Sequence, residues 1–166
     1  MKVKKAPLVL AAAFFVSGAA YVSLPLGGFP KPLPEAVRST EPADVETPLR
    51  RGYFTDATRE QVIAHYKSQF GSLPTFRLNY PPEEAQALIR DQTRSTYLEE
   101  LVQPGRESVF INGFEPHRDN EAIVVDGKRY EQKIIVRYAP SGLHIRLMVV
   151  ALSTLLIYAL LYQFLS

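Results

Sequence analysis

The strongest β-structure signal in the chain is AIVVDGKRYEQKIIVRY, residues 122–138. Asp126-Gly127 within it suits a type I′ turn, because both central residues of that turn need a positive φ. One face of the second arm carries apolar and aromatic side chains, at Tyr130, Ile134, Val136 and Tyr138. Gln132 is the exception on that face. The pattern predicts an antiparallel β-hairpin near the C-terminal end of a folded domain.

Helix signals precede this hairpin. Thr58 and Gln61 have the spacing of a capping box, and Gly71 suits the position after a helix C-terminus. Between them, an apolar stripe at helical spacing is formed by Val62, Ile63, Tyr66 and Phe70. A second helix is expected over residues 81–91, because proline fits the first turn and the acidic pair Glu83-Glu84 interacts favourably with the helix dipole.

Three further segments bear on the sheet. Residues 75–80 alternate between polar and apolar, which predicts a half-buried strand. Residues 97–102 fit a helix or a strand equally well, and residues 108–111 fit a strand that Asn112-Gly113 would close with a turn. Because helices and antiparallel strands are interspersed, residues 53–140 are predicted to form an α+β domain of two helices and an antiparallel sheet with a C-terminal hairpin.

Two long apolar segments flank this domain. Residues 1–28 contain an uncharged run long enough to cross a bilayer, and we interpret them as an N-terminal transmembrane helix or signal anchor. The small residues of Ser17-Gly18-Ala19 leave a cleavable signal peptide as the alternative. Residues 147–166 are also uncharged, and residues 143–166 are predicted to form a C-terminal transmembrane helix.

The packing and ends of these helices can also be anticipated. Ala13 and Ser17 form a small-xxx-small pair at which the second helix could approach closely. Arg146 stands at the entrance of the second helix, where a long cationic side chain is expected to extend to the lipid headgroups.

Two groups of basic residues give opposite signals for orientation. Lys2, Lys4 and Lys5 favour a cytoplasmic N-terminus, which would place the domain outside the cytoplasm. The basic residues on the domain side of the second helix would instead favour a cytoplasmic domain. The loop between the helices is long, and long loops are translocated largely regardless of charge. We therefore expect a two-pass protein of the cell membrane, with both ends in the cytoplasm and the central domain outside.

Prolines are concentrated in residues 29–52, between the first apolar segment and the domain. Proline at this density favours an extended conformation and opposes helices and central strands. The segment is interpreted as a semi-rigid stalk, with a disordered linker as the equally weighted alternative.

Charge and cysteine content exclude several classes of function. All 17 acidic residues and all but four of the 19 basic residues lie between the apolar segments, so the domain is slightly acidic. Nucleic-acid binding is not expected, because no basic stripe is present for a phosphate backbone. The chain has no cysteine, which rules out disulfides and thiolate chemistry.

No motif for catalysis, a cofactor or a metal stands out. His65, His117 and His144 are far apart and none has the spacing of a metal-binding pair. The chain contains no Gly-x-Ser-x-Gly motif, and adjacent acids such as Glu99-Glu100 point in different directions on a helix. We therefore predict no catalytic, cofactor-binding or metal-binding residues.

One polar run, residues 91–97, separates two apolar segments and is a candidate interaction surface. Its anchors would be Asp91, Arg94 and Tyr97, since tyrosine and arginine are enriched at binding hot spots. A helix terminus whose side chains satisfy backbone groups is the favoured interpretation of the same run.

Taken together, these features favour a non-enzymatic membrane protein of the bacterial envelope. Its small exported domain would make protein–protein contacts, as an accessory subunit of an envelope assembly or as a homo-oligomer. The alternatives are a ligand-binding or sensory module and, less favoured, an envelope hydrolase. The identity of a partner or ligand does not follow from the sequence.

Overall fold

The computed structural model of the chain describes residues 5–81 and 95–164. They form two compact units, a helical unit built from the two ends of the chain and a domain that spans residues 27–140. The predicted helix over residues 81–91 lies, apart from Pro81, outside the described residues.

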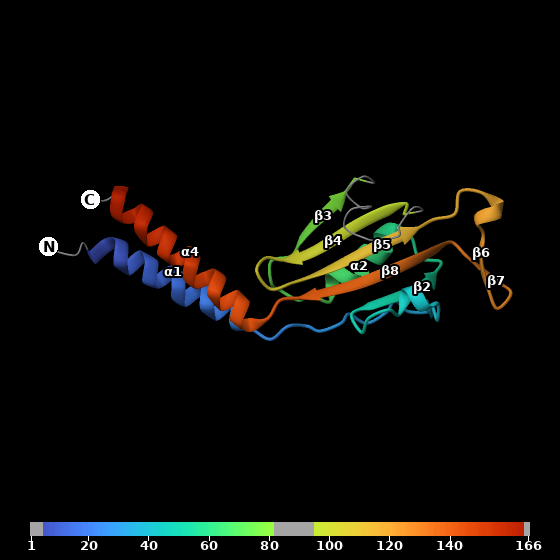
Figure 1. The fold of residues 1–166 in the computed structure, drawn as a ribbon. Coiled ribbons are helices and arrows are strands. Elements are labelled where there is room, and N and C mark those ends of the chain that lie inside the picture. Colours follow the sequence, from blue (N-terminus) through green and yellow to red (C-terminus); the bar gives the residue numbers. More distant parts are fainter. Residues whose placement is uncertain (1–4, 82–94, 165–166) are drawn as a thin grey trace. The chain divides into compact units, whose positions relative to one another are not determined.

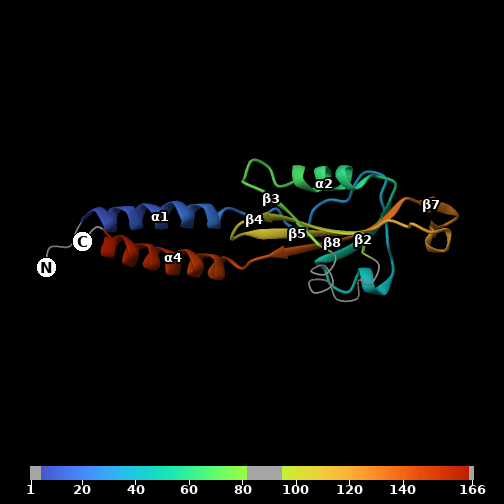
Figure 2. The ribbon, with the colours of Figure 1, turned by 90° about the horizontal axis from the view of Figure 1, so that it is seen from above.

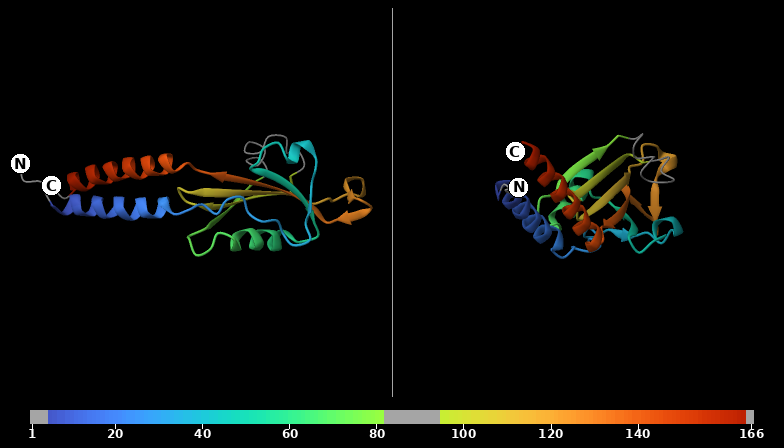
Figure 3. Two further views of the ribbon diagram at one scale, coloured as in Figure 1. Left: turned by 90° about the horizontal axis from the view of Figure 1, so that it is seen from below. Right: turned by 60° about the vertical axis from the view of Figure 1, so that its left-hand side comes forward.

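The helical unit consists of α1 (Lys5–Ser23) and α4 (Leu143–Phe164), which lie side by side (Figure 3). At 1.5 Å per residue, each is about 30 Å long, close to the hydrocarbon thickness of a bilayer. Both helices are long enough and apolar enough to cross a membrane. Large apolar side chains such as Val16 and Leu155 are exposed on them, as lipid-facing residues would be.

The two helices approach each other at other positions than the predicted pair. Ala13 and Ser17 are exposed, whereas Gly18 faces Val150 so closely that a Cβ on Gly18 would lie 3.1 Å from a Val150 methyl group. Arg146 also differs from expectation, because it is buried and its guanidinium donates to the Val22 carbonyl at the end of α1. A cation is favourable there, since the last carbonyls of a helix lack partners within the helix.

The domain contains a six-stranded antiparallel sheet and the helix α2 (Arg59–Ser68), so the predicted α+β class is confirmed. The order across the sheet is β1-β2-β8-β5-β4-β3 (Figure 1). The strands are β1 (Val37–Arg38), β2 (Arg50–Thr55), β3 (Phe76–Tyr80), β4 (Tyr97–Gln103), β5 (Glu107–Phe114) and β8 (Gln132–Pro140). Short 3₁₀ turns are η1 (Pro42–Asp44) and η2 (Asp119–Glu121).

Helix α2 covers one face of the sheet, here called the inner face (Figure 2). Thr58 caps it through the predicted capping box with Gln61. The hydrophobic core lies between α2 and the inner face and includes Val62, Ile63, Tyr66, Tyr97, Leu101, Val109, Ile111, Ile134, Val136 and Tyr138. The opposite surface of the sheet is here called the outer face.

Strand register assigns residues to the two faces. Leu78, Glu100, Phe110, Arg137 and Arg50 are successive cross-strand partners and form one row over five strands. Because side chains alternate along a strand, this row lies on the outer face, opposite the core residues.

The structure settles one strand that the sequence left open and corrects the end of another. Residues 97–103 form strand β4, and β5 continues through Asn112-Gly113, where a closing turn was expected. Gly113 is needed because its neighbour Tyr97 lies over it: a Cβ on Gly113 would lie 2.1 Å from the Tyr97 ring. A glycine within a strand therefore marks a close approach here and not a turn.

The predicted hairpin forms, but it is separate from the main sheet. β6 (Ile123–Val125) and β7 (Lys128–Tyr130) pair around Asp126 and Gly127, both of which have positive φ as a type I′ turn requires. The second arm then breaks after Tyr130, and β8 pairs with β2 and β5.

The proline-rich segment, interpreted from the sequence as a stalk over residues 29–52, packs on the domain. Leu33 is buried in the inner core, and the Phe29 ring contacts the Tyr138 ring edge-on at 6.4 Å between centroids. The backbone N–H of Lys31 donates to the Gln69 side chain after α2 at 2.8 Å. Prolines keep this segment extended, and an extended chain can lay side chains along a sheet.

The same segment then passes around the β1 edge to the outer face. β1 pairs with β2, and Asp44 of η1 is buried beside Gly52. The Asp44 carboxylate is 2.8 Å from the Lys133 ammonium, which also contacts Glu41 at 2.8 Å. A side chain at position 52 would clash with Asp44, so glycine is required there.

Candidate functional site

The structure describes one of the three predicted anchor residues, because Asp91 and Arg94 lie outside the described residues. Tyr97 is only 5% exposed and belongs to the core. Its hydroxyl donates to the Gln132 side chain at 2.6 Å, and the Arg59 guanidinium lies 4.8 Å from its ring centroid. Burial raises the pKa of the Tyr97 hydroxyl, so the group remains a donor. Tyr97 organises the interior and offers little surface to a partner.

An ion cluster between α2 and β3 surrounds Glu99, which is fully buried. Arg77 binds both oxygens of this carboxylate at 2.7 and 2.8 Å, and Arg59 binds it from α2 at 2.9 Å through Nε. Glu60 on α2 contacts Arg77 at 3.1 Å and is mostly exposed. Burial tends to raise the pKa of Glu99, but hydrogen bonds from the two arginines outweigh it and the pKa is lowered.

This cluster holds elements together. Each charge has a partner of opposite sign, and Glu99 joins the edge strand β3 to the helix α2. Its satisfied geometry gives no group a free position for acid–base chemistry. The adjacent Glu100 is on the outer face and accepts a hydrogen bond from the Tyr80 hydroxyl, so the two acids point in opposite directions, as strand geometry requires.

A second buried polar group lies at the end of the sheet where β5 begins. Tyr138 donates to the Glu107 carboxylate at 2.5 Å, and the backbone N–H of Gly27 lies 3.4 Å from the other oxygen. Arg106 is buried beside them, with Nη2 at 4.0 Å from Glu107. Burial and then the hydrogen bond to Glu107 raise the pKa of Tyr138. These contacts fix Gly27, where the chain enters the domain, to β5.

The outer face presents apolar side chains at its β3 edge. Phe76 is 56% and Leu78 is 43% exposed, although the alternation of β3 predicted a half-buried strand. Within the described residues, β3 pairs only with β4, so its other edge has backbone donors and acceptors facing outward.

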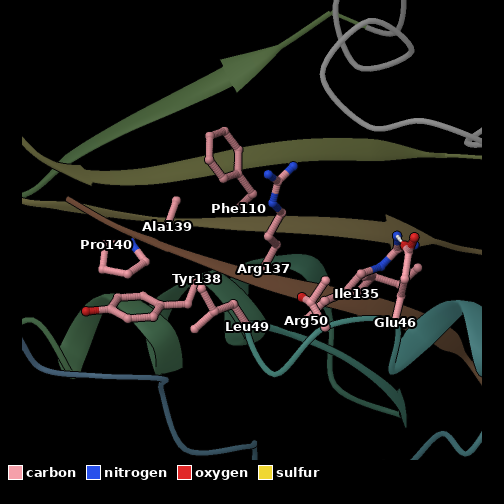
Figure 4. A pocket seen from close by; sticks show the side chains of 10 residues that line it. Glu46, Leu49, Arg50, Phe110, Ile135, Arg137, Tyr138, Ala139 and Pro140 are labelled. Atoms are coloured by element: carbon pink, nitrogen blue, oxygen red, sulfur yellow. Dashed lines mark hydrogen bonds and ion pairs between the residues drawn. The ribbon is translucent and has the colours of Figure 1, made fainter. Parts of the chain in front are cut away.

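The same face has a cavity of about 540 Å³ at its opposite side, between the loop before β2 and the end of β8 (Figure 4). Arg50 and Arg137 both line it. Sequence reasoning missed this site, because the two arginines come from strands 87 residues apart and only the sheet register brings them together.

The histidines have local roles where the structure shows their contacts. His65 bonds the Lys31 carbonyl and the Gln69 side chain, at 3.1 and 3.0 Å. Among residues 5–81 and 95–164, no group of three or more histidine, aspartate or glutamate side chains could hold a metal ion. Comparisons with protein-family models, with curated proteins and with solved structures give no match to this chain.

Proposed function

We propose that this chain is a non-enzymatic, two-pass membrane protein whose exported domain binds a protein partner through the outer edge of β3. The partner contributes a strand or an apolar loop to that edge. The chain would then serve as an accessory subunit of an envelope assembly.

The exposed edge of β3 is the observation that carries this proposal. An edge strand is usually protected by lysine, proline, a bulge or a covering element. The five residues of β3 include neither lysine nor proline, and the Arg77 side chain is held in the ion pair with Glu99. Phe76 and Leu78 thus remain as apolar contacts beside an edge that no strand of residues 5–81 or 95–164 pairs with, and strand addition uses such an arrangement.

Tethering by two helices supports a contact function. A domain held close to a bilayer by both α1 and α4 meets other membrane proteins in two dimensions, so a modest edge contact is enough for a stable association. The three lysines at the start of the chain support a cytoplasmic N-terminus and hence an exported domain.

Site-specific photo-crosslinking in intact cells tests the proposal. The photoreactive residue p-benzoylphenylalanine replaces Leu78 in one variant and Lys67 in the control. Lys67 is exposed on α2, on the other side of the sheet. We expect a discrete crosslinked product from position 78 that is absent from position 67.

A second pair of variants distinguishes binding at the β3 edge from nonspecific hydrophobic association. Leu78→Lys should abolish co-purification of the crosslinked partner, whereas Val124→Lys, at an apolar residue of β6 that is even more exposed than Leu78, should not. Recovery of the wild-type chain as a lone monomer, with equal labelling from positions 67 and 78, would overturn the proposal.

A second candidate function, ligand binding or sensing, is favoured by the cavity on the outer face. Its volume of about 540 Å³ falls within the range of about 300–1,000 Å³ that is usual for small-molecule sites.

A further inference from the structure

We infer that the outer-face cavity binds an amphiphilic anion, a phosphate or carboxylate on an apolar body, with its charged group between the guanidinium groups of Arg50 and Arg137. The inference deepens the second candidate function and does not depend on partner binding at β3.

The first argument is the placement of two cations directly opposite each other. Arg50 and Arg137 are cross-strand partners in β2 and β8. The neighbouring pair, Leu49 and Tyr138, shares a backbone hydrogen bond at 2.9 Å, so Arg50 and Arg137 form the non-hydrogen-bonded type of pair. Side chains lie closest in such pairs, and like charges there are unfavourable. An anion between them would convert this repulsion into attraction.

The second argument is that the two guanidinium groups have few partners in the described part of the chain. Arg50 has one weak ion pair, at 3.4 Å to Glu46, whose side chain is 70% exposed. Its Nε is buried and makes no hydrogen bond with a described residue. Arg137 is exposed and no ion pair is found for it among described residues. By contrast, Lys133, the neighbouring cation on this face, is paired with Asp44 and Glu41.

The remaining cavity walls explain why the anion should carry an apolar body. Beside the arginines, the lining includes the apolar side chains of Leu49, Phe110, Ile135, Ala139 and Pro140. Figure 4 shows Phe110 and Arg137 lying next to each other over the sheet. Arginine binds carboxylate and phosphate oxygens through paired N–H groups, whereas an inorganic anion would leave the apolar walls without a contact.

Titration calorimetry with octyl phosphate on the full chain in neutral dodecyl maltoside micelles tests the inference, with inorganic phosphate as the comparison ligand. Heat from micelles alone is subtracted. We expect saturable octyl phosphate binding at least tenfold tighter than that of inorganic phosphate. Arg137→Gln and Arg50→Gln should each weaken it at least tenfold.

Arg129→Gln is the matched control, because it removes the same charge from the exposed β7. Binding in this variant should stay within twofold of wild type. Folding is checked by the thermal midpoint without ligand. Arg137→Gln should melt no lower than wild type, because it removes the repulsion between two adjacent cations.

Two results would overturn the inference: equal octyl phosphate binding by Arg137→Gln and Arg129→Gln, or inorganic phosphate binding as tightly as octyl phosphate. To identify the source of the ligand, the thermal midpoint of the chain is measured in phosphatidylcholine nanodiscs. An Arg137-dependent rise in thermal midpoint on adding phosphatidylglycerol to the discs identifies a bilayer lipid. A rise that occurs only with added octyl phosphate identifies a free amphiphile. Both results support the site.

Discussion

Glu99 is a buried charge whose environment keeps it ionised. Burial alone would raise its pKa, but hydrogen bonds from Arg77 and Arg59 hold the pKa below its ordinary value. A carboxyl with a lowered folded-state pKa contributes stability above its unfolded pKa and loses it as the pH falls through the folded pKa. The domain should therefore lose stability in acid partly through this group.

We expect Glu99→Gln to lower the free energy of unfolding by about 3 kcal/mol at neutral pH. This is the lower end of the range for breaking a buried ion pair, because both arginines are about one-third exposed and can regain water. Urea denaturation of the detergent-solubilised chain, followed by near-ultraviolet circular dichroism, gives the value. The difference in the free energy of unfolding between this variant and wild type should shrink below about pH 4, because protonation of Glu99 removes the same charge from wild type.

Glu60→Gln is the control, since Glu60 contacts the same Arg77 but its side chain is 72% exposed. An exposed pair contributes about 0–1 kcal/mol, so this variant should be nearly neutral. Equal losses from the two substitutions, or a gap that does not change with pH, would contradict the assigned role of Glu99.

Residue-scale features show what a sequence pattern can and cannot reveal. Gln132 broke the apolar face of its strand, and it does point into the interior, where it bonds the Tyr97 hydroxyl and the Ala57 carbonyl. Its partners could not be predicted, because they lie 35 and 75 residues away. Gly113 was interpreted as a turn residue for a similar reason: only the register places the Tyr97 ring over it.

At the scale of elements, local signals were sufficient for α2, β3 and the β6–β7 turn. The capping box and the Asp-Gly pair act within a few residues of themselves. Residues 97–103 and the proline-rich segment were not determined locally. Both gain their conformation from the sheet, β4 by pairing on both sides and the segment by burying Leu33 in the core. The cavity at Arg50 and Arg137 depends on the same long-range pairing.

Leu33→Ala tests whether the proline-rich segment is part of the folded domain. Leu33 is 6% exposed in the core, so its truncation should cost about 2–5 kcal/mol. Val45→Ala, in the same segment but 39% exposed, should stay within about 0.5 kcal/mol of wild type. Urea denaturation of both variants measures the difference. A free stalk would make the two substitutions equally neutral.

At the scale of the whole molecule, the two apolar helices at the ends of the chain pack against each other. The end of α1 and the start of α4 meet at the contact between Arg146 and Val22, so the helices run antiparallel. An antiparallel pair that crosses a bilayer places both chain ends on one side and the domain on the other. We expect the lysines at the N-terminus to determine which side is the cytoplasm.

The absence of native cysteine allows this topology to be tested with single introduced thiols. Val124→Cys places a thiol on the hairpin of the domain, at a residue that is 61% exposed, and a second variant carries a cysteine appended after Ser166. A membrane-impermeant maleimide added to intact cells should label position 124, because an exported domain is open to the reagent. The appended cysteine should be labelled only after lysis, because a cytoplasmic end is shielded by the bilayer. The reverse pattern would show that the basic residues flanking α4, and not the three N-terminal lysines, determine orientation. Labelling of both positions in intact cells would show that the two helices do not both span the membrane.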